Sequence, residues 1–253
     1  MKKGASRGPR IANHEPRIDA IFFGAHADDV ELSCGATIAR FVKDGLRVGI
    51  VDLTRGEMGT RGTPQTRARE SKAAAKILGA SFRQQLDLGD GGLRTGREEE
   101  LEIIGIVRRY RPALIFGPLP DDRHPDHTRA GRLITEASFY AGLRKIETDL
   151  PAHRPQVVIY YLQHYLLPPS FIVDVSETWK TKMRAIDAYQ SQFHDPRTKA
   201  PRTFISEKGF LQMIEARGRH FGALIGAAFG EAFVTKQPPR IEDVVRAYSG
   251  REV

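Results

Sequence analysis

Two short runs of histidine and aspartate hold the side chains of this sequence that are best suited to chemistry. They read HADD at residues 26–29 and HPDH at residues 124–127, and they include three of the eight histidines. Imidazole nitrogens and carboxylate oxygens bind zinc in hydrolytic sites, which commonly combine three protein ligands with one bound water. The two runs therefore predict a metal held by nitrogen and oxygen, with acids and bases left over for catalysis.

The spacing within the runs indicates which residues hold the metal. His26 and Asp29 lie three residues apart on a turn, so both can reach one ion, and His127 completes a His/Asp/His set. The open position would hold water, whose pKa the metal lowers to about 7. Two histidines and one carboxylate also suit non-haem iron(II), so the ligand types leave zinc, iron(II) or another divalent ion open.

The remaining side chains of the two runs predict proton transfer and charge stabilisation. Asp28 should point away from its neighbour Asp29, and a carboxylate beside metal-bound water is suited to act as general base. An imidazolium at His124, held by Asp126, would stabilise an oxyanion because it places positive charge where negative charge develops. Each run also has a structural alternative, since Asp29 or Asp126 could cap a helix. Two such runs, each after a strand, favour the metal site.

Apolar stretches precede both runs and predict the strands that position them. Residues 21–25 read IFFGA and residues 113–117 read ALIFG, and turn residues bound each stretch. In an open α/β sheet, sites form beyond the carboxyl ends of the strands. Both runs should therefore lie at the same edge of one sheet.

Strand and helix signals alternate along the first half of the chain. Strands are predicted over residues 19–25, 46–53, 81–88 and 113–116, and helices over 31–43, 67–78, 97–110 and 128–142. This order predicts a three-layer, Rossmann-like α/β fold, with a mostly parallel sheet and helices on both faces. The second half is predicted to hold strands at 157–163 and 171–175, a helix from Ser176 to Gln192, and a helix over 207–228 that breaks near Gly218 or Gly222.

Length and charge predict one domain over residues 18–253, preceded by a basic tail over residues 1–17. The tail carries half of the net charge of +8. Nucleic-acid binding through it is an alternative function of a different class, although no stacking aromatic motif accompanies the charge. No stretch approaches the roughly 18 apolar residues of a membrane span. The single cysteine, Cys34, excludes an internal disulfide and, with no apolar leader, predicts a cytoplasmic protein.

Three segments resemble the signatures of the LmbE/PIG-L-like zinc N-deacetylases. They read GAHADDVE at residues 24–31, TRGEMG at 54–59 and DRHPDH at 122–127. The resemblance extends through DVSE at 174–177 and YQSQF at 189–193 to EAF at 231–233. These later segments most resemble the branch that includes the bacillithiol-biosynthesis deacetylase, which removes acetyl from N-acetylglucosaminyl-malate.

The resemblance implies the same roles as the spacing. By position it places the metal ligands at His26, Asp29 and His127, the general base at Asp28, and the oxyanion-stabilising histidine with its orienting acid at His124 and Asp126. It places sugar-binding residues at Arg67 and Asp90, for which a solvated arginine and a turn aspartate are the alternatives. Glu57, in a glycine-flanked loop, is a further candidate for substrate binding, and Arg55 and Arg61 could meet a carboxylate such as that of malate.

The resemblance implies a metal-dependent hydrolase that removes the N-acetyl group from an N-acetylglucosamine conjugate. N-acetylglucosaminyl-malate is the first candidate, and another N-acetyl sugar or a chito-oligosaccharide is the alternative. Two positions depart from the family pattern: Ala27 replaces a common proline, and Phe210 stands where some relatives have a tyrosine that assists the oxyanion. The resemblance also implies a homo-oligomer, a trimer or hexamer, in which Tyr160–Leu162 could pack between chains or in the core.

Overall fold

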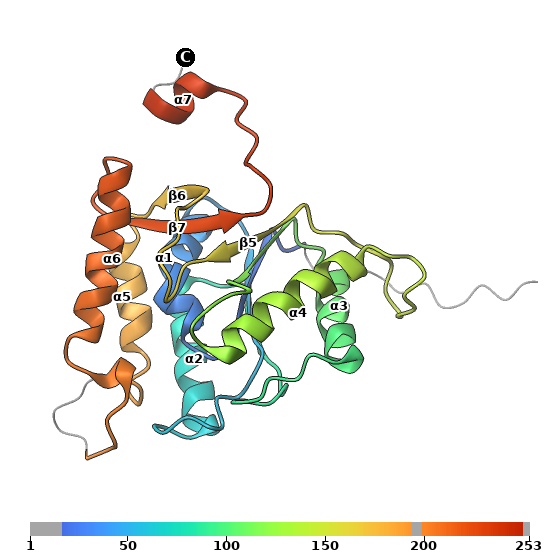
Figure 1. Ribbon diagram of the computed structural model, residues 1–253, viewed down its shortest axis with the longest axis horizontal. Coiled ribbons are helices and arrows are strands. Elements are labelled where there is room, and N and C mark those ends of the chain that lie inside the picture. The colour runs from blue at the N-terminus through green and yellow to red at the C-terminus, as the bar shows by residue number, and fades with distance from the viewer. Residues whose placement is uncertain (1–16, 194–198, 250–253) are drawn as a thin grey trace, which may run out of the picture.

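The computed structural model describes residues 17–193 and 199–249, so the predicted basic tail lies outside the described residues except for Arg17. Seven strands form one sheet in the order β3-β2-β1-β4-β5-β7-β6, and β5, β7 and β6 are labelled in Figure 1. Their bounds are β1 Ala20–Gly24, β2 Val48–Asp52, β3 Phe82–Gln85, β4 Leu114–Pro118, β5 Val157–Tyr161, β6 Phe171–Asp174 and β7 Gly230–Thr235. The strands from β3 to β5 are parallel, whereas β7 is antiparallel to both β5 and β6.

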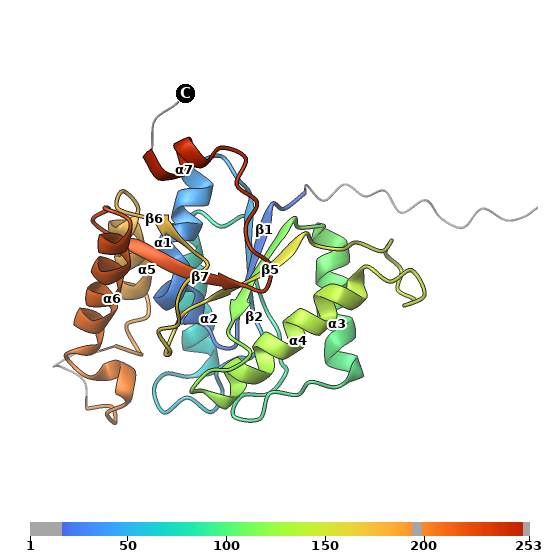
Figure 2. The same cartoon turned by 45° about the horizontal axis from the view of Figure 1, so that its top comes forward.

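Helices cover both faces of this sheet, with α1, α2, α5 and α6 on one face and α3 and α4 on the other (Figures 1 and 2). Their bounds are α1 Asp29–Lys43, α2 Pro64–Leu78, α3 Arg97–Tyr110, α4 Pro125–Ala141, α5 Trp179–Asp187, α6 Phe210–Leu224 and α7 Val244–Ser249. Successive strand side chains point to opposite faces, so Phe22 joins one core and Phe23 the other. The predicted three-layer α/β fold is confirmed. No helix of the described residues is long and apolar enough to cross a membrane.

The strand order places both histidine-bearing runs at one edge of the sheet. β1 lies between β2 and β4, so the chain leaves β1 toward one side and later returns on the other. The crevice beyond the carboxyl ends of two such strands is where open α/β sheets bind ligands. Residues 26–29 follow β1 and residues 124–127 follow β4, which confirms the predicted juxtaposition.

The second half of the chain differs from the prediction in three places. Residues 230–235 form β7, which was not predicted as a strand. α6 ends at Leu224 and is continuous through Gly218, where a Cβ atom would collide with the Trp179 ring, so this glycine permits close packing. α5 begins after Thr178, because the Ser176 hydroxyl instead accepts hydrogen bonds from the backbone of residues 228 and 229.

Helix α1 is interrupted at Cys34, whose φ of −141° lies outside the helical range. The Leu32 carbonyl accepts a hydrogen bond from Arg217 Nη2 at 2.7 Å. Beyond the break, the Glu231 carboxylate accepts hydrogen bonds from the backbone N–H of Ala36 at 3.2 Å and of Thr37 at 2.6 Å. Residues from α6 and β7 thus satisfy the backbone groups that the break leaves unpaired, and they hold the first turns of α1 in place.

Replacing Glu231 with alanine is expected to lower the free energy of unfolding by about 3–5 kcal/mol. Lys182 Nζ lies 2.6 Å from Glu231 Oε1, and both side chains are 2% exposed, so the substitution leaves a buried ammonium without its partner. Urea denaturation measures the change. Glu177→Ala, which removes an exposed pair with Lys43, is the control and should change stability little. Equal effects of the two substitutions would contradict the expectation.

Candidate active site

A cavity of about 350 Å³ opens at the edge of the sheet where the two runs meet. This volume is in the range of small-molecule sites. Both runs contribute to its wall, together with the loop after β2, the start of α2, the loop after β5 and the first turns of α6. The lining includes His26, Asp28, Asp29, His124 and His127.

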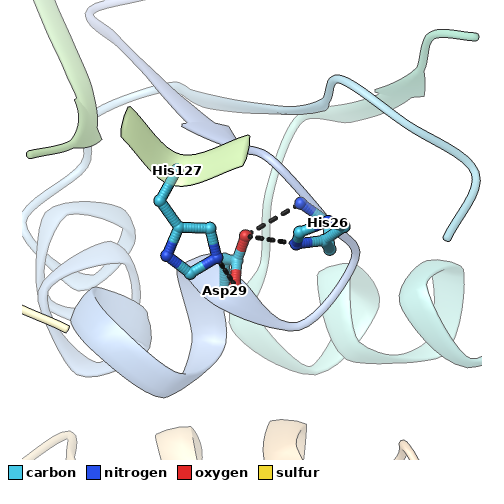
Figure 3. A group of neighbouring side chains, drawn as sticks. All are labelled: His26, Asp29 and His127. Atoms are coloured by element: carbon cyan, nitrogen blue, oxygen red, sulfur yellow. Dashed lines mark hydrogen bonds and ion pairs between the residues drawn. The ribbon is translucent and has the colours of Figure 1, made fainter. Parts of the chain in front are cut away.

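His26, Asp29 and His127 converge on one point beside this cavity (Figure 3). His26 Nδ1 lies 3.4 Å from Asp29 Oδ2, and His127 Nε2 lies 3.2 Å from Asp29 Oδ1. Their ligand atoms all lie within 4.8 Å of one another. The Asp29 carboxylate caps no helix, since it accepts a hydrogen bond from the backbone N–H of His26 at 2.8 Å. Two imidazole nitrogens and a carboxylate fit a divalent ion such as zinc.

The carboxylates of Asp29 and Asp122 stabilise the protonated, positively charged form of His127. Burial lowers the pKa of His127, but the adjacent Asp29 and Asp122 outweigh that effect and raise the pKa to about 9. Asp122 Oδ1 lies 3.2 Å from His127 Nδ1, the ring nitrogen that faces away from Asp29. A carboxylate in this position fixes the orientation of a metal-ligating histidine. Asp122 lies inside the third signature, but no role was predicted for it from the sequence.

Asp122→Ala is expected to weaken metal binding by about 10- to 100-fold, because His127 loses the partner that orients its ring. Competition with a chelator of known affinity measures the change. Asp121→Ala is the matched control, since this neighbouring aspartate is exposed and should bind no less metal when replaced. Unchanged affinity in Asp122→Ala would show that His127 needs no such support.

Asp28 combines burial, strain and a shifted pKa. It is 5% exposed and precedes α1 with a φ of 115°, one of two positive values among the described non-glycine residues. Strained backbone of this kind concentrates at functional sites. Burial raises the pKa of the carboxyl group to about 7, although Arg67, with Nη2 at 3.4 Å from Oδ2, acts in the opposite direction. Such a group can both accept and return a proton near neutral pH.

His124 is arranged differently from the expected imidazolium held by Asp126. Its Nδ1 accepts a hydrogen bond from the backbone N–H of Asp126 at 3.2 Å, so the proton of the neutral ring is on Nε2. Burial, together with the neighbouring histidines His127 and His26, lowers the pKa of His124, which favours this neutral form. His124 lines the cavity and can therefore donate a hydrogen bond without carrying a charge.

The Asp126 carboxylate faces His26 rather than His124. It accepts hydrogen bonds from the backbone N–H of Gly91 at 2.7 Å and of Leu93 at 3.1 Å, and Oδ2 lies 3.5 Å from His26 Nε2. Asp126 therefore neither caps α4 nor orients His124, contrary to expectation. It holds the turn after β3 against the ring of His26.

The three predicted substrate-binding residues differ in whether they line the cavity. Arg67 and Asp90 line the cavity, and Asp90 Oδ1 lies 3.0 Å from His26 Nε2. Arg67 Nη2 also donates to the Ala27 carbonyl at 2.6 Å, which supports the loop that carries Asp28. Glu57 is not part of the lining, since its carboxylate accepts a hydrogen bond from the backbone N–H of Asp90 at 2.9 Å.

The loop after β5 contributes two lining residues that the sequence argument missed, Gln163 and His164. Gln163 Nε2 donates to Asp29 Oδ1 at 2.8 Å. His164 stacks on His127 with ring centroids 5.4 Å apart. The available signal was their position at the end of the strand predicted over 157–163, since Gln163 is its last residue and His164 follows it.

Known proteins share both this sequence pattern and this fold. Residues 21–138 match the family PIG-L, described as GlcNAc-PI de-N-acetylase. Diacetylchitobiose deacetylase of Thermococcus kodakarensis is 36% identical over 183 residues, which cover 66% of this chain and 67% of that protein. The conserved protein TT1542 from Thermus thermophilus has a TM-score of 0.82 and 38% identity, over 90% of this chain and 98% of its own.

Other relatives include one with a similar name and two whose names describe other substrates or reactions. N,N'-diacetylchitobiose deacetylase from Pyrococcus horikoshii has a TM-score of 0.75 and 28% identity, over 87% of this chain and 84% of its own. "Probable N-acetyl-alpha-D-glucosaminyl L-malate deacetylase 2" of Bacillus anthracis is 28% identical, over 75% of this chain and 87% of its own. A 4-oxalmesaconate hydratase of Pseudomonas putida is 27% identical, over 71% of this chain and 76% of its own. The similarity is therefore not specific to the bacillithiol branch.

Proposed function

This chain belongs to the PIG-L family of metal-dependent de-N-acetylases, and we propose that it removes the acetyl group from an N-acetylglucosamine-containing saccharide. A chito-oligosaccharide such as N,N'-diacetylchitobiose is the first candidate, supported by the relatives of that name from Thermococcus and Pyrococcus. The observation that carries the proposal is the convergence of His26, Asp29 and His127 beside the buried Asp28 at one cavity. Metal-dependent amide hydrolysis uses this combination of a metal site and a general base.

His26, Asp29 and His127 are the proposed metal ligands. A divalent ion held by them, zinc in the first place and iron(II) or another ion as alternatives, would supply Lewis acidity toward the acetyl carbonyl and would lower the pKa of a water molecule. Asp122 and Gln163 hold two of these ligands in place, through His127 Nδ1 and Asp29 Oδ1.

Asp28 and His124 are proposed to move the proton and stabilise the charge. The Asp28 carboxylate accepts a proton from a water molecule while the oxygen of that water bonds to the carbonyl carbon. His124 donates a hydrogen bond from Nε2 to the carbonyl oxygen while negative charge builds there. When the C–N bond breaks, the departing sugar amine takes a proton from Asp28, with His124 as the alternative donor. Arg67 and Asp90 are proposed to hold sugar hydroxyls, and Glu57 to act on the substrate only through Asp90.

N-acetylglucosaminyl-malate is the second candidate substrate, and the guanidinium of Arg61 at the cavity, unpaired among the described residues, favours it. Arg61 lines the cavity and is 6% exposed, and its side chain forms no hydrogen bond or ion pair with any other residue that the structure describes. A buried guanidinium without a counter-ion is costly, and a substrate carboxylate would offset that cost. The pairing of Arg55 with Asp87 at 3.2 Å leaves Arg61 as the better candidate of the two.

Release of free amine from N-acetylated saccharides tests the proposed function. Metal-loaded protein is incubated with N,N'-diacetylchitobiose, N-acetylglucosaminyl-malate and N-acetylglucosamine, and product amine is quantified. Arg61→Leu should impair hydrolysis of the malate conjugate and spare that of the chitobiose. Amine release from none of the substrates would overturn the proposal, and hydration of 4-oxalmesaconate in its place would group the chain with the Pseudomonas relative.

Self-association is also proposed, through a segment other than the one expected. Tyr160, Tyr161 and Leu162 are at most 3% exposed and belong to the core of the chain. The exposed apolar residues nearby are Tyr165, Leu166 and Leu167, at 44%, 61% and 43%. An apolar patch of this kind commonly marks an interface, and a trimer or hexamer remains the expected assembly. Light scattering at micromolar concentration should give an oligomeric mass that Leu166→Asp reduces, whereas a monomeric wild-type protein would refute it.

A further inference from the structure

Gln163 is held rigidly at the wall of the cavity, immediately beyond the end of β5. Its backbone carbonyl accepts a hydrogen bond from Arg217 Nη1, and Nη2 of the same guanidinium donates to the Leu32 carbonyl at 2.7 Å. One partly buried arginine thus ties Gln163 to the helix that begins with Asp29. The Gln163 side chain therefore has little freedom to move relative to the metal ligands.

The orientation of the Gln163 side-chain amide follows from its partner. Nε2 donates to Asp29 Oδ1 at 2.8 Å, and an ionised carboxylate only accepts hydrogen bonds, so the oxygen is the other end of the amide. That oxygen, Oε1, is buried and has no hydrogen-bond partner among the residues that the structure describes. Gln163 as a whole is 9% exposed. A buried acceptor without a donor is unfavourable, and in native proteins it calls for an explanation.

We propose that Gln163 Oε1 accepts a hydrogen bond from the N–H of the substrate acetamide, and that this contact selects secondary amides over esters. The inference rests on the proposed function. A secondary amide has one acceptor and one donor, and two residues that line the cavity each have a matching group: Nε2–H of His124 for the carbonyl, and for the N–H the buried Oε1 of Gln163, which no donor of the described residues occupies. Donation to the Asp29 carboxylate polarises the Gln163 amide, which makes Oε1 a stronger acceptor.

The test compares two substrates that differ only in the atom carrying the acetyl group. These are the methyl glycoside of N-acetylglucosamine and methyl 2-O-acetyl-glucopyranoside, which has oxygen in place of N–H. Gln163→Met removes the acceptor at similar side-chain volume. At saturating metal, it should lower kcat/KM for the amide about tenfold more than for the ester, the value of one neutral hydrogen bond.

Two further variants separate recognition of the N–H from support of Asp29. Asp122→Ala disturbs a metal ligand without touching Gln163, so it should lower the rates of amide and ester equally. Gln163→Glu keeps an acceptor oxygen but loses the donor to Asp29. It should weaken metal binding, measured by chelator competition, and retain the wild-type ratio of amide to ester rates, so the test does not depend on the folding of one substitution.

Each outcome identifies which proposal fails. An equal fall of both rates in Gln163→Met, or a lowered ratio in Gln163→Glu, would overturn the role of Oε1 while leaving the deacetylase proposal intact. Absence of amide hydrolysis in the wild-type protein would overturn the proposed function itself. A fall in kcat/KM in Gln163→Met that is about tenfold larger for the amide than for the ester would support the contact.

Discussion

Asp28→Asn is expected to lower kcat by about 10²- to 10⁴-fold while the protein keeps its metal. The amide has nearly the same volume as the carboxyl group and tolerates the left-handed backbone at this position, where φ is 115°. It cannot accept the proton that water loses when it attacks the acetyl carbonyl. The metal ligands His26, Asp29 and His127 are untouched. Steady-state kinetics on N,N'-diacetylchitobiose, with elemental analysis of the same samples, measure both quantities.

The control for this prediction is Asp87→Asn, an aspartate of the same sheet edge whose side chain is 62% exposed and pairs with Arg55. It should leave kcat unchanged. Asp29→Ala should instead lose metal and activity together, because Asp29 lies between the two imidazoles. A metal-replete Asp28→Asn protein with near-normal kcat would rule out Asp28 as the general base, even if the protein proved to be a deacetylase.

His26→Ala and His127→Ala are each expected to reduce metal content from full occupancy to background and to abolish activity. Each substitution removes one of three protein ligands, and a hydrolytic zinc site rarely holds its ion with two. Dialysis against a chelator, reloading with zinc and elemental analysis measure the occupancy. Circular dichroism of the same samples confirms that the variants are folded.

A second group of side chains makes this experiment discriminating. Asp122, His127 and His164 also have ligand atoms within 4.8 Å of one another, and this second group shares His127 with the first. A third group, His26, His124 and Asp126, meets the same criterion and shares His26 with the first. His164→Ala is therefore the matched control, and it should retain full occupancy if His26 and Asp29 complete the site. Loss of metal in His164→Ala with retention in His26→Ala would place the ion in the second group.

Local patterns in the sequence were sufficient to predict the scaffold and to predict that the two histidine-bearing runs lie at one edge of the sheet. Apolar stretches of strand length alternate with helical spacing, and the order of elements restricts an α/β chain to a mostly parallel sheet. The helix predicted over 97–110 is observed as Arg97–Tyr110. Because the carboxyl ends of parallel strands share one edge, the position of HADD and HPDH directly after strands predicted that they would meet.

Contacts between distant parts of the chain were decided by tertiary structure alone. Beyond the break in α1, the Glu231 carboxylate accepts a hydrogen bond from the backbone N–H of Thr37, a residue 194 positions away in the sequence. β7 is a strand because it pairs between β5 and β6. α6 runs through Gly218 without a break because this glycine lets the Trp179 ring pack closely against the helix.

The sequence by itself determined which residue types reach the site, and the tertiary structure decided which atoms face one another there. Spacing brought Asp126 near His124, but the N–H groups of Gly91 and Leu93 direct its carboxylate toward His26. The same holds for Gln163, whose free Oε1 follows from the position of Asp29. The physical reason is that strand and helix periodicities act over a few residues, whereas the direction of a buried polar group depends on hydrogen-bond partners supplied by packing.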